Sequence, residues 1–256
     1  MGIKTEWRID GVIVEVYETS QEAAFAVADH FADQISKKSN AVLGLATGGT
    51  PIESYGRLIE MCEQGSVCFR GVTTFNLDEY IGLTGDHAQS YRSFMQTQLF
   101  DHIDVTPHRT RIPNGGADDI PAECAAYEAK IKDCGGIDLQ LLGLGHNGHI
   151  AFNEPGSAKE SRTRRVELTR DTIDKNSRFF SSKEEVPTEA ITMGIATILE
   201  CRRLLVLVTG EAKAEAVATM LCGPISTDCP ASLLRGHLDV RVILDEGAAS
   251  RLPAPS

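Results

Sequence analysis

The sequence predicts an α/β fold: a doubly wound, mainly parallel, Rossmann-like sheet with helices on both faces. Two observations support this prediction. Apolar runs of strand length alternate with helix-periodic segments along most of the 256 residues, and several runs are apolar at every position. Alternating strands and helices are typical of βαβ units, which build parallel sheets. The length suits one large domain, so we expect a single α/β domain over residues 1–256.

Six segments are predicted to form strands because each is apolar along most of its length. They are residues 12–16, 41–46, 72–77, 137–143, 204–209 and 240–244. Runs such as AVLGLA and LLVLV have no polar face, which is expected of central strands that helices cover on both sides.

Five segments between the strands are predicted to form amphipathic helices. Thr19 begins the first with Glu22 three residues later, the pattern of a capping box. The second begins at Thr50 and has Pro51 at its first helical position. The remaining three are expected over residues 121–134, 187–199 and 211–221.

Residues 156–185 interrupt this alternation with a charged stretch rich in Ser, Arg and Lys. Such an insertion is either a lid over a binding site or a solvent-exposed excursion, and composition leaves both interpretations open. We expect a lid insertion.

Composition restricts the class of partner and the compartment. The formal net charge is −11, which argues against nucleic acid or an anionic membrane as the main partner. The seven cysteines are odd in number and include no CxxC, which indicates reduced thiols. The N-terminus lacks a signal-peptide pattern, and no run approaches the ~20 apolar residues of a membrane helix. We therefore expect a cytoplasmic protein with no nucleic-acid or membrane partner.

Unusual sequences follow four of the predicted strands: TGGT, DEY, LGHNGHIAFNEP and GEAK. In an open parallel sheet the carboxyl ends of the strands share one edge, and ligands bind beyond that edge. The four sequences are therefore expected to converge on one site.

The first of these sequences is a candidate phosphate-binding loop formed by Thr47, Gly48, Gly49 and Thr50. Two glycines allow a sharp turn that directs backbone N–H groups at one point, and the next helix adds the positive end of its dipole. A plain strand-to-helix turn is the alternative. Lys213 favours the phosphate interpretation because a cation in the first turn of a helix is otherwise unfavourable. Arg178 is a second candidate clamp, although four other arginines lie near it.

The second sequence offers two carboxylates, Asp78 and Glu79, directly after a predicted strand. A partly desolvated carboxylate there suits a general base, whereas a helix cap is the common alternative. Asp78 follows the apolar run directly, so we expect it to be the buried member of the pair.

The third sequence combines histidines with an acid. His149 is a candidate general acid or base, oriented by Glu154, whose backbone Pro155 restricts. A zinc site formed by His146, His149 and Glu154 is a weaker alternative, because both histidines lie on a glycine loop.

Several segments together resemble the glucosamine-6-phosphate deaminase family. They are LATGGTPIESY, TTFNLDEYIGL, SYRSFM, GLGHNGHIAFNEPGS, SRTRRVELT, NSRFF, VPTEAITMGIATIL and GEAKAEAV. The match runs in the right order from about residue 42 to residue 246. The related 6-phosphogluconolactonases share the architecture but lack the NEP segment that residues 153–155 form here.

The resemblance implies an aldose–ketose isomerase and deaminase that converts glucosamine 6-phosphate and water to fructose 6-phosphate and ammonia, in amino-sugar catabolism. Asp78 would move a proton from C2 to C1. His149, with Asn147 and Glu154, would open the sugar ring. The phosphate would be bound by Thr47, Gly48, Gly49, Thr50, Arg178 and Lys213, and no metal or organic cofactor is implied.

Two departures from the family pattern modify this expectation. Asn147 stands where many members have Asp, which leaves open what tunes His149. Val166 stands where the allosterically activated hexameric members have Lys, and the chain stops at Ser256, soon after its last strand. We therefore expect weak or absent activation by N-acetylglucosamine 6-phosphate and a monomer or small homo-oligomer.

Three alternatives remain beside the deaminase interpretation. A galactosamine-6-phosphate deaminase differs only at C4 of the substrate, and no residue decides between the epimers. A 6-phosphogluconolactonase-like hydrolase is the second. A non-catalytic phosphosugar sensor is disfavoured because no DNA-binding helix-turn-helix precedes residue 42 and the net charge is wrong for DNA.

Overall fold

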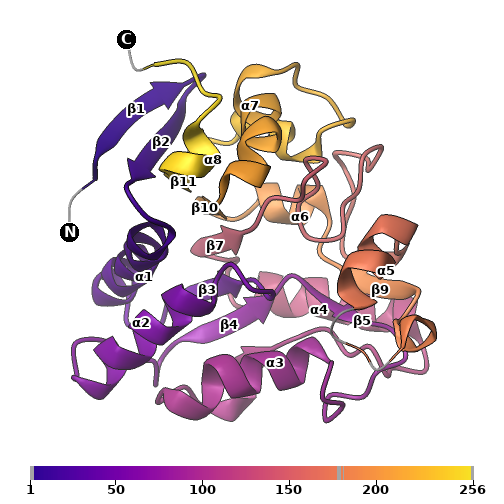
Figure 1. Cartoon of the computed structure of the whole chain (residues 1–256). Helices are drawn as coiled ribbons and strands as arrows, with labels where there is room; N and C mark the ends of the chain where they lie inside the picture. The colour runs from indigo at the N-terminus through magenta and orange to yellow at the C-terminus, as the bar shows by residue number, and fades with distance from the viewer. Residues whose placement is uncertain (1–2, 178–179, 181, 255–256) are drawn as a thin grey trace.

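The computed structural model describes residues 3–177, 180 and 182–254, and it shows an α/β fold built on an eight-stranded sheet (Figure 1). The strand order is β1-β2-β11-β10-β7-β3-β4-β6, and all neighbours are parallel except β1 and β2. The bounds are β1 Thr5–Ile9, β2 Val12–Tyr17, β3 Val42–Leu45, β4 Thr73–Asn76, β6 Thr110–Arg111, β7 Leu139–Leu142, β10 Leu204–Val208 and β11 Val240–Asp245. The predicted fold class and all six predicted strands are confirmed.

The helices connect successive strands and cover the sheet. They are α1 Ser20–Lys37, α2 Ile52–Glu63, α3 Tyr91–Gln98, α4 Ile120–Asp133, α5 Arg170–Asn176, α6 Ile195–Leu199, α7 Ala214–Cys222 and α8 Glu246–Ala249. Short 3-10 turns occupy η1 Phe100–His102, η2 Pro107–Arg109, η4 Lys183–Glu185, η5 Glu211–Lys213 and η6 Pro230–Gly236. The predicted cap of α1 is confirmed, because the Thr19 side chain accepts a hydrogen bond from the Glu22 amide. None of the described helices is long and apolar enough to cross a membrane.

A second, three-stranded antiparallel sheet has the order β5-β9-β8, with β5 Asp78–Tyr80, β8 Arg164–Glu167 and β9 Glu189–Thr192. The predicted helix over residues 187–199 is therefore wrong in its first half. Residues 190–192 are buried and paired on both sides, and this pairing outweighs the helix-like pattern. Residues 156–185 contain β8 and α5, so they carry structure of their own.

The order of the main sheet creates a crevice between two central strands. From β3 the chain proceeds outward through β4 to β6, whereas β7, β10 and β11 add strands on the other side. β3 and β7 are neighbours, so the chain leaves them in opposite directions. This is a topological switch point, where doubly wound sheets bind ligands.

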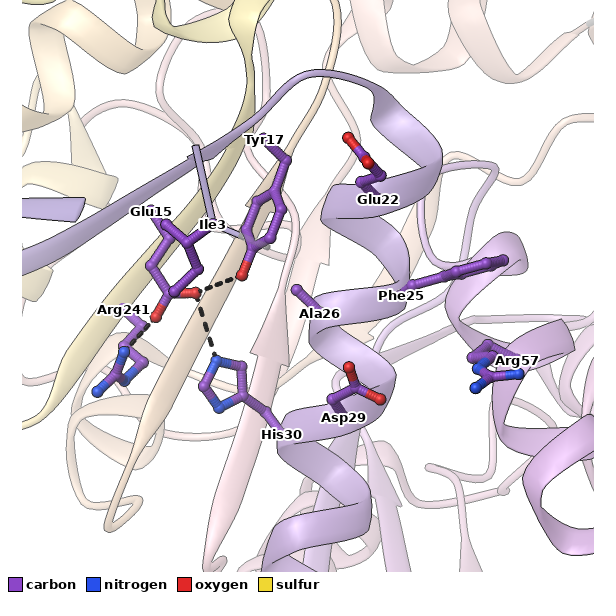
Figure 2. Close-up of a pocket in the computed structure, with 10 residues that line it drawn as sticks. All are labelled: Ile3, Glu15, Tyr17, Glu22, Phe25, Ala26, Asp29, His30, Arg57 and Arg241. Carbon is purple, nitrogen blue, oxygen red and sulfur yellow. Dashed lines mark hydrogen bonds and ion pairs between the residues drawn. The ribbon is translucent and has the colours of Figure 1, made fainter. Parts of the chain in front are cut away.

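The edge of the sheet near β2 is fixed to α1 by a buried carboxylate, Glu15 (Figure 2). The Tyr17 hydroxyl donates to Glu15 Oε2 at 2.9 Å, Arg241 from β11 binds Oε1, and His30 Nε2 from α1 lies 3.6 Å from Oε2. Burial opposes the charge, but the bonds from His30, Arg241 and Tyr17 outweigh it and hold the pKa of Glu15 at about 2. The cluster ties α1 and β11 to β2.

Candidate active site

A cavity of about 500 Å³ lies at the carboxyl edge of the main sheet. Thr47 follows β3, Asp78 follows β4, His149 follows β7 and Lys213 follows β10, and all four line this cavity. The predicted convergence of four strand ends is therefore confirmed.

The glycine loop after β3 forms one wall. Gly48 has a φ of +100°, a left-handed conformation that side chains rarely adopt, and the loop leads into α2 at Ile52. Thr47, Gly48 and Thr50 line the cavity, whereas Gly49 belongs to the same loop but does not line it. The loop thus presents backbone and hydroxyl groups beside the N-terminus of a helix.

Lys213 lines the same cavity. It ends the 3-10 turn η5 and immediately precedes α7, so the helix begins slightly later than predicted. Its Nζ donates to the Leu144 carbonyl oxygen at 2.7 Å, which connects the loops after β10 and β7. Arg178, the other predicted phosphate clamp, lies outside the described residues.

Both carboxylates of the pair after β4 are buried, which corrects the prediction that only Asp78 would be. Asp78 is 6% exposed and Glu79 is 2% exposed. Glu79 accepts hydrogen bonds at 2.9 Å from the amides of Tyr80, Tyr91 and Arg92, and it thereby caps α3. Asp78 instead lines the cavity, and burial, with the charge of Glu79, raises its pKa to about 8.

His149 and Glu154 form the predicted pair, with the histidine facing the cavity. His149 Nδ1 lies 3.5 Å from Glu154 Oε2. Asn147 Nδ2 donates to the same oxygen at 2.8 Å, and Thr172 donates to Oε1 at 2.9 Å. Burial acts to raise the pKa of Glu154, but these contacts lower it to about 2, so the carboxylate is ionised at neutral pH. Asn147 thus acts on Glu154 by donating a hydrogen bond, which an ionised Asp does not do.

The zinc hypothesis finds no support in the geometry. The His146 and His149 rings are 6.2 Å apart and perpendicular, and His146 Nε2 lies 3.3 Å from an oxygen of Asp171. Within the described part of the chain, no three His, Cys, Asp or Glu side chains come together as metal ligands would.

Sequence reasoning missed three residues that line the cavity: Tyr91, Thr172 and Asn176. Tyr91 belongs to α3 and the other two belong to α5, so none of them follows a strand of the main sheet. The four-residue spacing of Thr172 and Asn176 places them on one helix face and was the available signal.

Comparison with known proteins follows this geometry. The fold and the position of the cavity define the class: a doubly wound α/β enzyme fold that binds its ligand at the switch point of a parallel sheet. The chain belongs to the family of glucosamine-6-phosphate isomerases and 6-phosphogluconolactonases, whose family model matches residues 15–242.

Several individual proteins of known name or structure are similar to this chain. A glucosamine-6-phosphate deaminase of Hahella chejuensis is 60% identical over 218 residues, which are 85% of this chain and 83% of the relative. A solved monomeric glucosamine-6-phosphate deaminase superposes with a TM-score of 0.91 at 49% identity, over 93% of this chain and 98% of that one. The 6-phosphogluconolactonase of Trypanosoma brucei shares the fold, with a TM-score of 0.75 at 23% identity over 94% and 98% of the two chains.

Proposed function

We propose that this chain is a glucosamine-6-phosphate deaminase, which converts glucosamine 6-phosphate and water to fructose 6-phosphate and ammonia. The relatives of 60% and 49% identity carry this name. The observation that carries the proposal is the buried Asp78 carboxylate, which lines the same cavity as the His149–Glu154 pair. Isomerisation requires a base strong enough to take a proton from carbon, and burial makes a carboxylate more basic. Hydrolysis of a lactone has no such step.

The substrate phosphate contributes binding energy and does not react. Thr47, Gly48, Thr50 and Lys213 line the cavity and supply hydroxyl groups, backbone dipoles and a cation, so we place the phosphate at the end of the cavity that they form. We assign phosphate binding to them, together with Gly49 and Arg178. Binding energy at this end orients the sugar carbons toward the reacting groups at the other.

Ring opening moves a proton from the anomeric hydroxyl to the ring oxygen. His149 faces the cavity and exchanges protons, while Glu154 stays ionised behind it and stabilises the imidazolium that forms. Asn147 holds Glu154 in that position through the 2.8 Å bond. Asn147, which stands where many family members have Asp, thus still gives the Glu154 carboxylate a hydrogen-bond partner.

Isomerisation follows on the open chain. Ionised Asp78 takes the proton from C2 and returns it to C1, so one carboxylate serves both carbons. In the enolamine formed between these two transfers, the C1 oxygen takes up a proton that the nitrogen at C2 releases, so protonation of C1 leaves a C2 iminium. Water attacks this iminium, and ammonia leaves as the ketone of fructose 6-phosphate forms. Water supplies the oxygen at C2, and the atoms balance without an oxidant or reductant. The residues in these roles account for the chemistry with no metal or organic cofactor.

Several further properties belong to the same proposal. We assign residues 156–185 as a lid, because Thr172 and Asn176 within them line the cavity. A monomer or small homo-oligomer is proposed from the monomeric relative, and a cytoplasmic location from seven unpaired cysteines. Weak or absent activation is proposed from Val166, and saturation curves with and without N-acetylglucosamine 6-phosphate test it. A clear change from sigmoidal to hyperbolic curves contradicts it.

The direct test measures ammonia and fructose 6-phosphate released from glucosamine 6-phosphate by wild type, Asp78→Asn and a surface control, Asp101→Asn. Equal release of both products, abolished only in Asp78→Asn, supports the reaction and the base. Galactosamine 6-phosphate and 6-phosphogluconolactone are assayed in parallel. A higher kcat/KM on either of them, or no reaction with any, refutes the proposal.

A further inference from the structure

Helix α5 carries three contacts to the site on its inner side, and the proposed function assigns none of them a role. Asp171 lies 3.3 Å from His146 Nε2, Thr172 donates to Glu154, and Asn176 Nδ2 donates to the Tyr80 hydroxyl at 2.8 Å. Thr172 and Asn176 are four residues apart, so they project from one face of the helix into the cavity wall. This face connects two separate parts of the site.

The first connection runs through Thr172 to the ring-opening group. Glu154 presents Oε2 to His149 and Asn147, while Oε1 accepts the Thr172 hydroxyl at 2.9 Å and the Thr169 hydroxyl at a longer 3.4 Å. A carboxylate held at both oxygens cannot rotate, so the edge that faces His149 is fixed. Thr172 is buried, so water does not readily replace its hydroxyl.

The second connection runs through Asn176 toward the phosphate loop. The Tyr80 hydroxyl accepts the Asn176 amide and lies 3.3 Å from the Tyr91 hydroxyl. Tyr91 lines the cavity together with Thr47 of the phosphate loop, and the two tyrosine rings pack 4.8 Å apart. Burial raises the pKa of Tyr80 to about 12 and that of Tyr91 well above its usual value. Both hydroxyls therefore keep their protons at neutral pH, and the hydrogen bonds among Asn176, Tyr80 and Tyr91 run from α5 to the cavity wall that Tyr91 shares with Thr47.

We propose that Thr172 and Asn176 are positioning residues with separate tasks: Thr172 aligns Glu154 for ring opening, and Asn176 aligns the phosphate loop through Tyr80 and Tyr91. The proposal rests on the proposed deaminase function and names two residues that serve it without reacting. One short helix thereby sets the geometry at both ends of the substrate.

Loss of the two tasks should change different kinetic constants. Ring opening is a chemical step, so a misaligned Glu154 lowers kcat and leaves substrate binding intact. The phosphate loop binds substrate and transition state alike, so its misalignment raises KM. An open-chain analogue, 2-amino-2-deoxyglucitol 6-phosphate, separates the effect on ring opening from the effect on phosphate binding, because it has the phosphate but no ring to open.

The experiment compares Thr172→Val, Thr172→Ser and Asn176→Leu with wild type and with Thr219→Val. Val keeps the shape of Thr and removes the hydroxyl, and Ser restores the hydroxyl. Thr219 is the control because it is an exposed threonine of α7 whose hydroxyl donates to the Glu215 carbonyl oxygen of its own helix. The measurements are kcat and KM for glucosamine 6-phosphate, Kd for the open-chain analogue, and the unfolding midpoint.

Thr172→Val is expected to lower kcat about tenfold, the effect of losing one hydrogen bond to a charged group, with KM and Kd within twofold. Thr172→Ser is expected to recover most of kcat. Asn176→Leu is expected to raise both KM and Kd about tenfold. Thr219→Val is expected to match wild type in every measurement.

Three outcomes overturn the proposal while the deaminase function stands: kcat unchanged in Thr172→Val, equal loss in the Val and Ser variants, or Asn176→Leu with wild-type KM and Kd. A lowered unfolding midpoint with unchanged kinetic constants also overturns it, because the two residues would then serve stability alone. A wild-type protein that releases no ammonia refutes the proposed function itself, and the positioning roles fall with it.

Discussion

Replacing the proposed base should abolish activity and, unusually for a buried residue, stabilise the protein. Asp78 is 6% exposed and its pKa is about 8, so folding disfavours the charged form that this carboxyl group prefers in water. Asn has nearly the same shape and no charge. Asp78→Asn therefore removes the unfavourable burial of charge while leaving the cavity wall intact.

The expected size of the effect follows from the two pKa values. The pKa of Asp78 rises from an ordinary 3.8 to about 8 on folding. Between these values the folded chain binds a proton that the unfolded chain releases, so stability falls as pH rises through this range. At about 1.4 kcal/mol per pH unit, the penalty is about 2 kcal/mol at pH 5 and about 4 kcal/mol at pH 7. Asp78→Asn avoids this penalty at every pH.

Urea unfolding of both proteins, followed by circular dichroism from pH 4 to pH 8, measures this difference. The variant should match wild type near pH 4, and its advantage should grow steadily toward pH 8. Asp101→Asn, on the surface, should show no such trend. An advantage that does not change with pH, or a variant less stable than wild type at pH 7, would refute the assignment of Asp78 as a strongly basic buried carboxylate.

Three further predictions follow from described contacts. The kcat/KM of wild type should rise about tenfold from pH 7 and level off above about 8, because Asp78 loses its proton over this range. Glu79→Gln removes a neighbouring negative charge, so this variant should show the same rise at lower pH. Glu15→Gln should lower the free energy of unfolding at pH 7 by about 3 kcal/mol in urea titrations, because the pKa of the buried Glu15 falls from 4.5 to about 2 on folding. Since the pKa of Glu15 is about 2, its contribution in wild type should be complete above 4.5 and lost as pH falls toward 2. Gly145→Ala should lower kcat about a hundredfold in steady-state assays, because a Cβ there would lie 2.4 Å from the His149 ring and displace it.

The sequence predicted the central part of the fold because these strands are buried on both faces. Runs such as β10 Leu204–Val208 are apolar at every position, and that pattern has few other interpretations. The edge strand β1 Thr5–Ile9 is half-exposed, and β6 Thr110–Arg111 has only two residues, so neither produces a clear periodic signal. β9 Glu189–Thr192 was assigned to a helix because its pairing partners are distant in sequence.

The site was predictable where residues follow strands of the main sheet, and not elsewhere. The parallel topology brings Thr47, Asp78, His149 and Lys213 together without any knowledge of side-chain positions. Thr172 enters the site from a helix of the insertion, and its place depends on how β8 pairs with β9. Pairing of that kind leaves no mark in the local sequence, so the four-residue spacing of Thr172 and Asn176 indicates a shared helix face but not that this face lines the site.

The small sheet also decides what can be removed from this protein. β9 lies between β5 and β8, with Asp78 opposite Thr192 and Thr192 opposite Arg164. Deleting residues 156–185 to open the cavity would remove β8 from this sheet and leave one edge of β9 unpaired, while the other edge stays paired with β5. An uncovered edge strand that contains the apolar Ile191 is a template for pairing with other chains, so the shortened protein should aggregate instead of becoming a more accessible enzyme.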